Sequence, residues 1–360
     1  MKQTALFESH KESGAKFVNF AGFELPILYQ DSGIIKEHLS VREFCGIFDV
    51  SHMGQAIITG VKCEDFLSYV TPTNFVNTEI GKAKYTVLLN EKASIIDDLI
   101  FYKLANDKFL VIFNAARKDV DIKWMSVKSK QFNCEFTFLE NQQLVALQGP
   151  KAEEIIKNVI DIDLTGFSFM SVREIDYNGE TIFISRSGYT GEDGFEISAS
   201  SKNIQPIWND VLKHGVKPIG LGARDSLRME MGFPLYGSDL SEQINVGSSN
   251  LKWIISSNDN FIGRDKIDNE PNSKRLAIKL DDKGILREKM DLYAEDQKTK
   301  IGSTTSGCFA PSLSYSIGQA YINTEYATIG SDIYVDIRGK LKKAKIVGLN
   351  FFKKEINSKK

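Results

Sequence analysis

A glycine-spaced stretch at residues 186–196 constrains the fold of this chain more than any other feature. It reads Arg-Ser-Gly-Tyr-Thr-Gly-Glu-Asp-Gly-Phe-Glu and lies between strand-like runs at 182–184 and 195–197. Its three glycines, at positions 188, 191 and 194, allow backbone angles and close approaches that a Cβ would block. The stretch therefore predicts a tight turn between two paired strands.

Two interpretations are open for the polar side chains of this stretch. Tyr189 can offer a ring face for stacking, and Glu196 can accept two parallel N–H bonds from the cyclic amidine edge of a pterin. Alternatively, Glu196 is merely solvated, because strand alternation turns Phe195 and Ile197 to one side and Glu196 to the other. Taken alone, the stretch favours this solvated hairpin.

A pair of aspartates inside an apolar run is the second unusual feature. Asp97 and Asp98 interrupt the run at 95–102, and strand alternation sends their carboxylates to opposite faces. A carboxylate facing an interior is costly without partners. The residues alone fit a carboxylate in a pocket and a turn aspartate held by backbone N–H groups equally well.

Composition excludes several classes of function. The 360 residues favour two or three domains, and a net charge of −2 gives no broad attraction to nucleic acid or to an anionic membrane. The four cysteines and four histidines lack metal-ligand spacing, and no dinucleotide fingerprint follows a strand, so we expect no metal and no nicotinamide cofactor. Because no leader-like or membrane-spanning run is present, we expect a cytoplasmic protein.

Periodicity predicts an α+β chain rather than a doubly wound one. The predicted helices cover 33–45, 61–70, 117–128, 151–159 and 203–214, and the predicted strands include 85–89, 95–102, 109–113 and 144–147. In the first helix, the spacing places Ile34, Ile35, His38, Leu39, Val41 and Phe44 on one buried face. A polar linker at 266–274 precedes short strands at 275–280, 318–322, 333–337 and 345–349, which indicate a small all-β domain before a solvated tail at 353–360.

The stretch at 186–196 resembles the signature of the aminomethyltransferase family, the T-protein of the glycine cleavage system. Further family motifs follow in the family's order along nearly the whole chain, at 20–26, 41–42, 46–54, 81–85, 97–99, 148–151, 220–228, 235–237, 260–264, 305–307 and 311–313. Each motif is short enough to arise by chance, but the same order of all of them along the chain is not expected by chance.

The resemblance implies a three-domain, ring-like (cloverleaf) α+β fold with tetrahydrofolate in the centre and a C-terminal barrel-like β domain. The implied domains are 1–50 with 140–235, 51–139 with 236–268, and 275–352. The implied reaction transfers the methylene of an aminomethyl group from the dihydrolipoyl arm of the carrier H-protein to tetrahydrofolate. It releases ammonia and forms 5,10-methylenetetrahydrofolate without metal.

The resemblance also implies site residues. Asp98, the second aspartate of the pair, matches the catalytic carboxylate of the family. The implied folate-binding residues are Tyr85, Asn114, Tyr189, Glu196, Arg224, Met53 and Tyr236. Purely structural roles stay open for three of them: Asn114 as a helix cap, Tyr85 as a half-buried aromatic residue of a strand, and Tyr236 as a core residue.

Three nearby side chains receive separate expectations. Arg228 is expected to pair with Asp225, and the resemblance gives His52 no chemical step. Arg287 matches a family arginine in the last domain, where contact with the carrier and simple exposure to solvent are both open.

Two departures and two other functions are also considered. Ala93-Ser94 stands where the family has two glycines, and the terminal segment at 349–354 differs from that of the family. Within enzymes, the alternative is a folate-dependent demethylase of a small methylated amine or sulfonium compound. A folate-binding protein without catalysis is the other class, but its relatives carry a Lys-Gly-Cys-Tyr-x-Gly-Gln-Glu motif that this sequence lacks.

Overall fold

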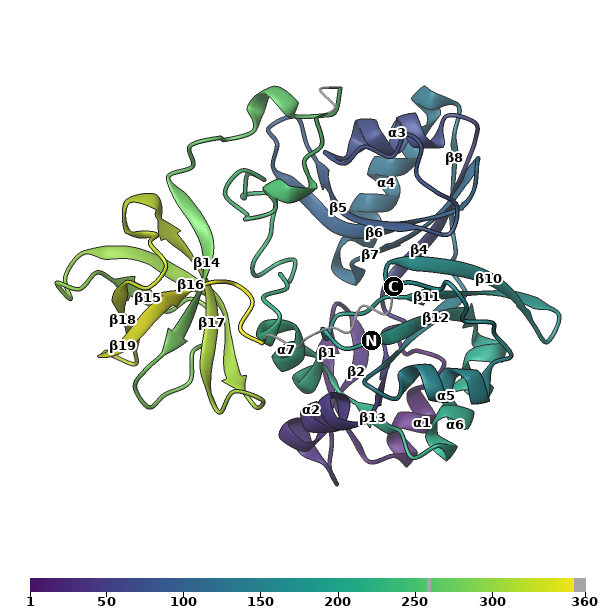
Figure 1. Cartoon of the computed structure of the whole chain (residues 1–360), viewed down its shortest axis with the longest axis horizontal. Coiled ribbons are helices and arrows are strands. Elements are labelled where there is room, and N and C mark those ends of the chain that lie inside the picture. The colour runs from purple at the N-terminus through teal and green to yellow at the C-terminus, as the bar shows by residue number, and fades with distance from the viewer. Residues whose placement is uncertain (258–259, 353–360) are drawn as a thin grey trace.

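Three lobes surround a common centre in the computed structural model, which describes residues 1–257 and 260–352 (Figure 1). One lobe is built on a six-stranded sheet, the second on a five-stranded sheet and the third on a closed barrel. The expected α+β composition and the all-β C-terminal domain are therefore confirmed. The tail at 353–360, expected to be solvated, lies outside the described residues.

The first lobe has the sheet order β10-β11-β12-β9-β3-β13. Its strands are β3 (Gly46–Asp49), β9 (Gln142–Gln148), β10 (Ser171–Tyr177), β11 (Glu180–Arg186), β12 (Gly194–Ser200) and β13 (Lys217–Ile219). Its other elements are α1 (Phe7–Glu12), the hairpin β1 (Ala15–Phe20) and β2 (Phe23–Tyr29), α2 (Gly33–Glu43), α5 (Ala152–Val159), α6 (Ser201–Lys213) and α7 (Leu221–Glu230). Phe195 and Ile197 pack with Trp208 of α6 in the core on one face of the sheet.

The second lobe has the sheet order β5-β6-β7-β4-β8. Its strands are β4 (Gly54–Thr59), β5 (Ala83–Leu89), β6 (Ile95–Ala105), β7 (Lys108–Phe113) and β8 (Glu135–Phe138), and its helices are α3 (Cys63–Val70), η1 (Ala115–Arg117), α4 (Lys118–Ser129) and η2 (Lys130–Phe132). Phe66 of α3 and Met125 of α4 pack on Leu99 and Phe101 of β6. The helices therefore cover one face of this sheet (Figure 1).

The face of the second sheet that α3 and α4 leave uncovered packs against the first sheet. Tyr102 and Ile112 of the second sheet share a buried cluster with Phe48, Ala146 and Phe183 of the first. The long segment after α7, with η3 (Lys252–Ile254) and η4 (Arg264–Lys266), returns to the second lobe and packs beside β5 and β6. This packing brings strands that are distant in sequence to one centre.

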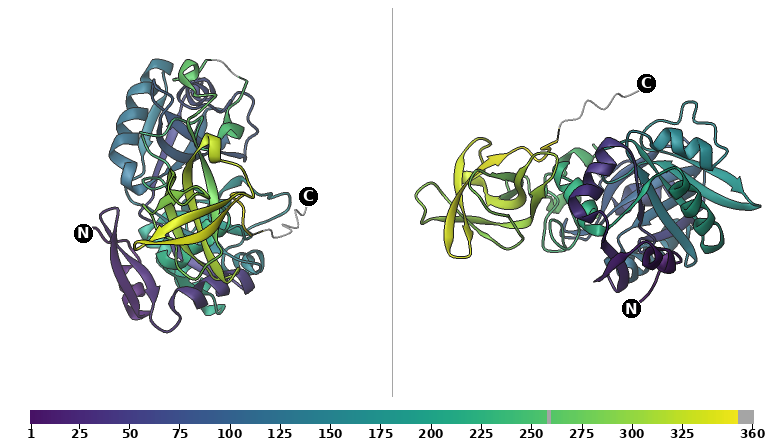
Figure 2. Two further views of the ribbon diagram at one scale, coloured as in Figure 1. Left: turned by 90° about the vertical axis from the view of Figure 1, so that its left-hand side faces the viewer. Right: turned by 90° about the horizontal axis from the view of Figure 1, so that it is seen from below.

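The barrel closes in the order β14-β17-β16-β15-β18-β19. Its strands are β14 (Ser273–Leu280), β15 (Asp291–Tyr293), β16 (Lys300–Ala310), β17 (Tyr315–Asn323), β18 (Asp332–Ile337) and β19 (Lys340–Val347). The short helix η5 (Thr324–Tyr326) lies between β17 and β18. Seen from below, the barrel lies at one end of the molecule and meets the rest near α7 (Figure 2). Met229 of α7 packs with Ala310 and Ile317 of the barrel, which fixes this junction.

The predicted helices all form, but the buried face predicted for α2 is partly wrong. Ile35 is 53% exposed and Phe44 is 38% exposed, whereas Glu37 and Arg42, which were not expected there, are buried; His38 is buried as expected. The reason is a set of long-range polar contacts that the apolar pattern does not reveal. Glu37 accepts hydrogen bonds from the backbone N–H groups of Tyr29 (2.7 Å) and Gly220 (2.8 Å). His38 hydrogen-bonds Ser226 (2.8 Å), and Arg42 donates to Glu230 (2.8 Å).

The turn predicted at 186–196 is a longer loop than expected. Pairing between β11 and β12 runs from Phe183 opposite Ser198 to Ser185 opposite Glu196, so residues 187–193 form the connection. Among the described residues, no helix is long and apolar enough to cross a membrane.

Candidate active site

Asp98 and Tyr85 lie on the side of the second sheet that faces the first sheet. In the antiparallel register of β5 and β6, Val87 is opposite Asp98 and Tyr85 is opposite Ile100, so the two polar side chains share a face. The Tyr85 hydroxyl donates a hydrogen bond of 3.0 Å to Oδ2 of Asp98. Strand pairing thus fixes one oxygen of this carboxylate.

Asn114, at the end of β7, holds both aspartates of the pair. Its side-chain Nδ2 lies 2.9 Å from Oδ1 of Asp98 and 2.9 Å from Oδ1 of Asp97, and its backbone N–H donates to Oδ2 of Asp97 at 3.0 Å. The side chain makes no capping bond to η1, so the capping alternative is wrong. Instead, the amide links the two faces of the sheet.

The expected separation of the two carboxylates onto opposite faces is confirmed. Asp97 is fully buried beneath the helices, with Leu99 and Phe101 on its side of β6, whereas Asp98 is partly exposed. Burial, followed by the charge of Asp97, raises the pKa of Asp98 from 3.8 to about 7. Burial and the neighbouring Asp98 charge also raise the pKa of Tyr85, which keeps its hydroxyl a donor.

The turn before this strand forms without the glycines of the family. Ala93 adopts the left-handed conformation (φ 58°), and its N–H donates to the carbonyl of Asn90 at 2.9 Å. The Asn90 side chain also accepts from the N–H of Ser94 (3.1 Å). A left-handed alanine costs on the order of 1 kcal/mol relative to glycine. These contacts stabilise the turn despite that cost.

Glu196 lies on β12 with two hydroxyl donors. Ser187 donates to its Oε2 at 2.6 Å, and Tyr102 of β6 lies 3.4 Å from the same oxygen. Among the described residues, the hydrogen bonds to Glu196 go to Oε2, so Oε1 is the oxygen that remains to meet a ligand. Glu196 is only partly exposed, so it is not the solvated hairpin residue of the alternative interpretation.

The glycines of the loop at 187–193 allow the close approaches expected of them. A Cβ on Gly188 would lie 2.0 Å from Oε1 of Gln148, and Gly191 has a left-handed φ of 77°. Gln148 donates to the carbonyl of Ser187 (2.8 Å) and accepts from the Thr190 hydroxyl (2.8 Å). Gln148 therefore positions the loop that carries Tyr189.

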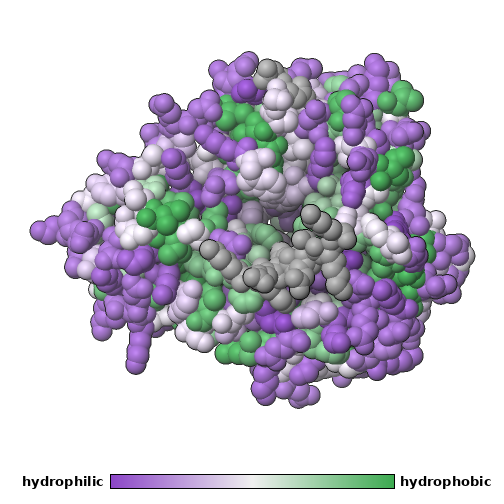
Figure 3. Space-filling view, in the orientation of Figure 1, coloured by the Kyte–Doolittle hydropathy of each residue, from purple (hydrophilic) through white to green (hydrophobic). Residues whose placement is uncertain are grey.

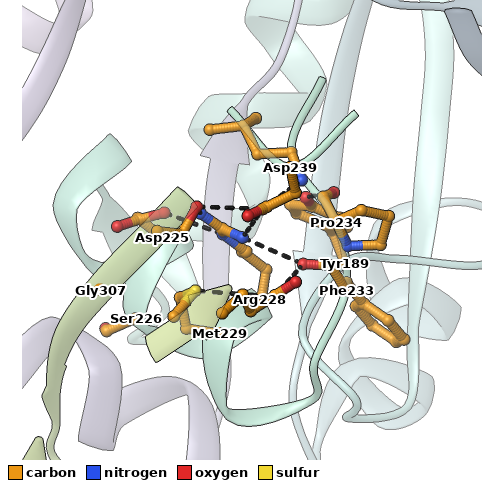
Figure 4. Close-up of polar contacts among 12 residues, drawn as sticks. Tyr189, Asp225, Ser226, Arg228, Met229, Phe233, Pro234, Asp239 and Gly307 are labelled. Atoms are coloured by element: carbon orange, nitrogen blue, oxygen red, sulfur yellow. Dashed lines mark hydrogen bonds and ion pairs between the residues drawn. The ribbon is translucent and has the colours of Figure 1, made fainter. Parts of the chain in front are cut away.

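Tyr189 lies against Arg224 of α7. The guanidinium of Arg224 lies over the Tyr189 ring at 4.7 Å from its centroid, and Phe233 stacks on the same ring at 5.7 Å. The Tyr189 hydroxyl donates to the carbonyl of Pro234 (Figure 4). The ring expected to offer a stacking face thus already has two planar neighbours.

Arg228 is a structural residue at the junction with the barrel. It pairs with Asp225 (2.9 Å), as expected, and also with Asp239 (2.7 Å), as Figure 4 shows. It donates as well to the Ser306 hydroxyl of β16 at 2.9 Å. These contacts join α7, the segment after it and the barrel.

The remaining predicted residues differ in their surroundings. Met53 is partly buried against the cluster between the two sheets. Tyr236 donates to the carbonyl of Ile95 (3.1 Å), and Arg117 lies over its ring. His52 is buried, and burial followed by the Arg224 charge lowers its pKa to about 3. A histidine with this pKa is a weak base at neutral pH.

Trp253 is a neighbour of the candidate site that the sequence interpretation missed. Its ring stacks on Tyr85 with centroids 6.0 Å apart and planes 18° apart, yet the side chain is 70% exposed. Its apolar neighbours Leu251 and Ile254 hid it in the sequence, and only its exposure in the fold marks it, because an exposed tryptophan often marks a binding surface. In the view of Figure 3 the molecular face is hollowed near its middle, where the three lobes meet.

Two further expectations concern metal and the barrel. Within residues 1–257 and 260–352, no group of histidine, cysteine or acidic side chains could hold a metal ion, and all four cysteines are buried and free. Arg287 is exposed on the barrel lobe, where it contacts the carbonyl of Gly307 at 3.3 Å. Its contact with a carrier stays a prediction.

The sequence matches two family descriptions, the GCVT N-terminal domain over residues 6–259 and the glycine cleavage T-protein C-terminal barrel domain over residues 274–353. It is 37% identical to an aminomethyltransferase of Thermotoga neapolitana over 98% of each chain, and 39% identical to one of Staphylococcus saprophyticus over 97% of this chain and 98% of the relative. The crystal structure of the glycine cleavage system aminomethyltransferase T from Bartonella henselae superimposes with a TM-score of 0.93, at 33% identity and over 98% of both chains.

Proposed function

The chain belongs to the aminomethyltransferase family, the T-protein of the glycine cleavage system, and from this premise we propose how its residues perform the reaction. It is a tetrahydrofolate-dependent aminomethyltransferase with the T-protein fold. The methylene of an aminomethyl group passes from the dihydrolipoyl arm of the carrier H-protein to tetrahydrofolate, ammonia leaves and 5,10-methylenetetrahydrofolate forms. A folate-dependent demethylase is not favoured, because the full-length relatives are aminomethyltransferases.

Asp98 is the proposed catalytic residue. Its two oxygens are held by Tyr85 and Asn114 on the centre-facing side of the sheet, so the carboxylate has a fixed direction. When the aminomethyl carbon leaves sulfur, positive charge develops on the transferred methylene and on the folate nitrogen that attacks it. A preorganised carboxylate stabilises that charge, and positioning of the two bound reactants supplies much of the remaining acceleration.

The proposed folate site lies on the elements around Asp98. Oε1 of Glu196 accepts N–H groups of the pterin edge, while Ser187 and Tyr102 orient the carboxylate through Oε2. Tyr189 orients Arg224, whose guanidinium binds an acceptor of the folate. The predicted contacts with Tyr85, Asn114, Met53 and Tyr236 belong to the same proposal. All eight predicted site residues are partly exposed, which supports access by a ligand.

Trp253 extends this proposal beyond the residues that the sequence suggested. Its exposed ring continues the aromatic surface of Tyr85 outward from Asp98. A stacked tyrosine and tryptophan form an apolar wall that suits the aromatic middle part of a folate. We propose that this wall guides the folate past the catalytic carboxylate.

The domain boundaries at 1–50 with 140–235, 51–139 with 236–268, and 275–352 are also proposed. Membership of the strands in the two sheets and the barrel supports them. The H-protein is the proposed macromolecular partner, and a cytoplasmic location stays a prediction.

The observation that carries the mechanism is the hydrogen-bonded set of Tyr85, Asp98 and Asn114. Its test combines purified protein, aminomethylated carrier and tetrahydrofolate, with ammonia and methylenetetrahydrofolate measured in parallel. We expect equal amounts of both products from the wild type and from the exposed control Asp107→Asn, and a strong loss in Asp98→Asn. Folate-dependent demethylation of a small methylated amine, without turnover of the carrier, would instead support the demethylase.

A further inference from the structure

Asp121 of α4 is a fully buried acid that the reaction described above does not use. Its side chain enters the core between α4 and the second sheet, with 0% exposure. Among the described residues, no donor gives a hydrogen bond to either of its carboxylate oxygens. An ionised carboxylate in this position would carry a large desolvation cost.

The polar neighbour of Asp121 is the carboxyl group of Asp97, and a hydrogen bond between the two can form only when one of them carries a proton. Two ionised carboxylates cannot hydrogen-bond, so one member of this pair must carry a proton. Asp97 already accepts from the backbone N–H and from the side-chain amide of Asn114. An acceptor of two N–H bonds is the ionised member, which places the proton on Asp121.

The charged groups around the pair act in opposite directions on Asp121, because Arg117 favours its ionised form and Asp98 its neutral form. The guanidinium of Arg117 in η1 donates hydrogen bonds to the carbonyl of Ile96 and to Glu242, and it lies over the Tyr236 ring. The other neighbouring charge is Asp98, which disfavours ionisation. Burial and the charge of Asp97 raise the pKa of Asp121 to about 11, so the acid stays neutral at physiological pH.

We propose that Asp121, as a neutral carboxylic acid, donates a hydrogen bond to Asp97 and thereby positions the Asn114 amide that holds the catalytic Asp98. The connection runs from the helix-covered face of the sheet to its centre-facing face. Two links are hydrogen bonds of the structure, Asp97 with both nitrogens of Asn114 and Nδ2 of Asn114 with Oδ1 of Asp98, and the proposed bond from Asp121 to its neighbour Asp97 adds the third. Asp121 is thus a positioning residue, and its role rests on the proposed role of Asp98.

Removal of the donated proton has a defined consequence. Without it, Asp97 is a buried charge with one stabilising donor fewer, and it binds a proton itself. A protonated Asp97 accepts more weakly from Asn114, so the amide and the Asp98 carboxylate lose their fixed orientation. We expect turnover to fall while tetrahydrofolate affinity changes little, because Asp121 does not reach the proposed folate site.

The test compares three variants in the full-length protein. Asp121→Asn keeps a side-chain donor of similar shape, Asp121→Leu removes it, and Val120→Ala is an exposed control on the same helix. We expect kcat within about threefold of wild type for Asp121→Asn and for the control. For Asp121→Leu we expect a fall on the order of ten- to a hundredfold with an unchanged folate Kd, provided that circular dichroism shows a folded protein.

A second readout does not depend on activity. Infrared spectroscopy of the wild type at pH 8 should show the C=O stretch of one protonated carboxyl group, and Asp121→Asn should lack it. Absence of this band in the wild type, full kcat in Asp121→Leu, or equal losses in Asp121→Asn and Asp121→Leu would overturn the inference. Full turnover in Asp98→Asn would overturn both the inference and the proposed role of Asp98, whereas an inactive Asp98→Asn beside a fully active Asp121→Leu would overturn the inference alone.

Discussion

Replacement of Asp98 by asparagine should stabilise the protein at alkaline pH even though it removes the catalytic charge. In the folded chain, burial and the Asp97 charge raise the pKa of Asp98 from 3.8 to about 7. A carboxyl group whose pKa is higher in the folded than in the unfolded state favours folding in its protonated form. The wild type therefore loses stability as the pH rises through this interval, and the asparagine variant, which does not titrate, avoids the loss.

The size of the effect follows from the shift. The interval from 3.8 to about 7 corresponds to at most about 4 kcal/mol, at about 1.36 kcal/mol per pKa unit. Solvent screening reduces this value because Asp98 is partly exposed. Asparagine also exchanges one of the acceptor oxygens used by Tyr85 and Asn114 for a donor, at a pH-independent cost of roughly 1–2 kcal/mol. The signature is therefore the slope: the stability difference should grow by about 1–2 kcal/mol between roughly pH 5.5 and 8, in favour of the variant.

Urea unfolding at a series of pH values measures this slope directly. The matched control is Asp107→Asn, an exposed aspartate in the turn between β6 and β7, whose curve should run parallel to that of the wild type. Parallel curves of Asp98→Asn and wild type from pH 5.5 to 8 would refute the raised pKa of Asp98. A stability difference that shrinks as the pH rises would refute it as well.

Further predictions concern activity and binding. Turnover of the wild type should rise with pH through about 7, because Asp98 must be ionised, and a flat profile from pH 5.5 to 8.5 would argue against it. Glu196→Gln should weaken tetrahydrofolate binding by roughly 1–3 kcal/mol in calorimetry, since one acceptor facing the pterin N–H groups becomes a donor; an unchanged Kd would return Glu196 to a structural role. Trp253→Ala should weaken the same binding by about 1 kcal/mol without loss of stability, because the removed ring is exposed; equal affinity would exclude Trp253 from the site. Arg287→Glu should raise KM for the carrier more at low than at high salt and leave folate Kd unchanged, and the absence of a carrier-specific effect would discard this contact.

Much of the fold could be predicted because it depends on local patterns. Alternation gave the strands β5, β6 and β7, and the opposite faces of Asp97 and Asp98 follow from the same rule. Short or less regular strands such as β15 and β10 went unpredicted, because pairing partners rather than their own sequence specify them. The prediction of the buried face of α2 was partly wrong for a related reason. Its unexpected buried polar side chains are satisfied by residues nearly two hundred positions away, such as Glu230 for Arg42.

The candidate site, too, was predictable from the sequence only in part. Motifs brought Asp98 and Glu196 to attention, but only the tertiary structure places Tyr102 beside Glu196 and Trp253 on Tyr85. The role of Asn114 also required the fold, since a residue that follows a strand and precedes a helix is locally a good cap. Its side chain turns instead toward two carboxylates on the adjacent strand, where a donor is needed more.

A single-turnover experiment tests the central claim most directly. Asp98→Asn and wild type are saturated with tetrahydrofolate and mixed with less than one equivalent of aminomethylated carrier, so that ammonia release reports a single turnover, with folate Kd measured on the same samples. The account predicts an unchanged Kd and a first turnover slowed by two orders of magnitude or more, on the scale of a lost preorganised electrostatic contact of about 3 kcal/mol. A wild-type rate of first turnover in the folded variant would contradict it, and so would a slow turnover explained entirely by lost folate binding.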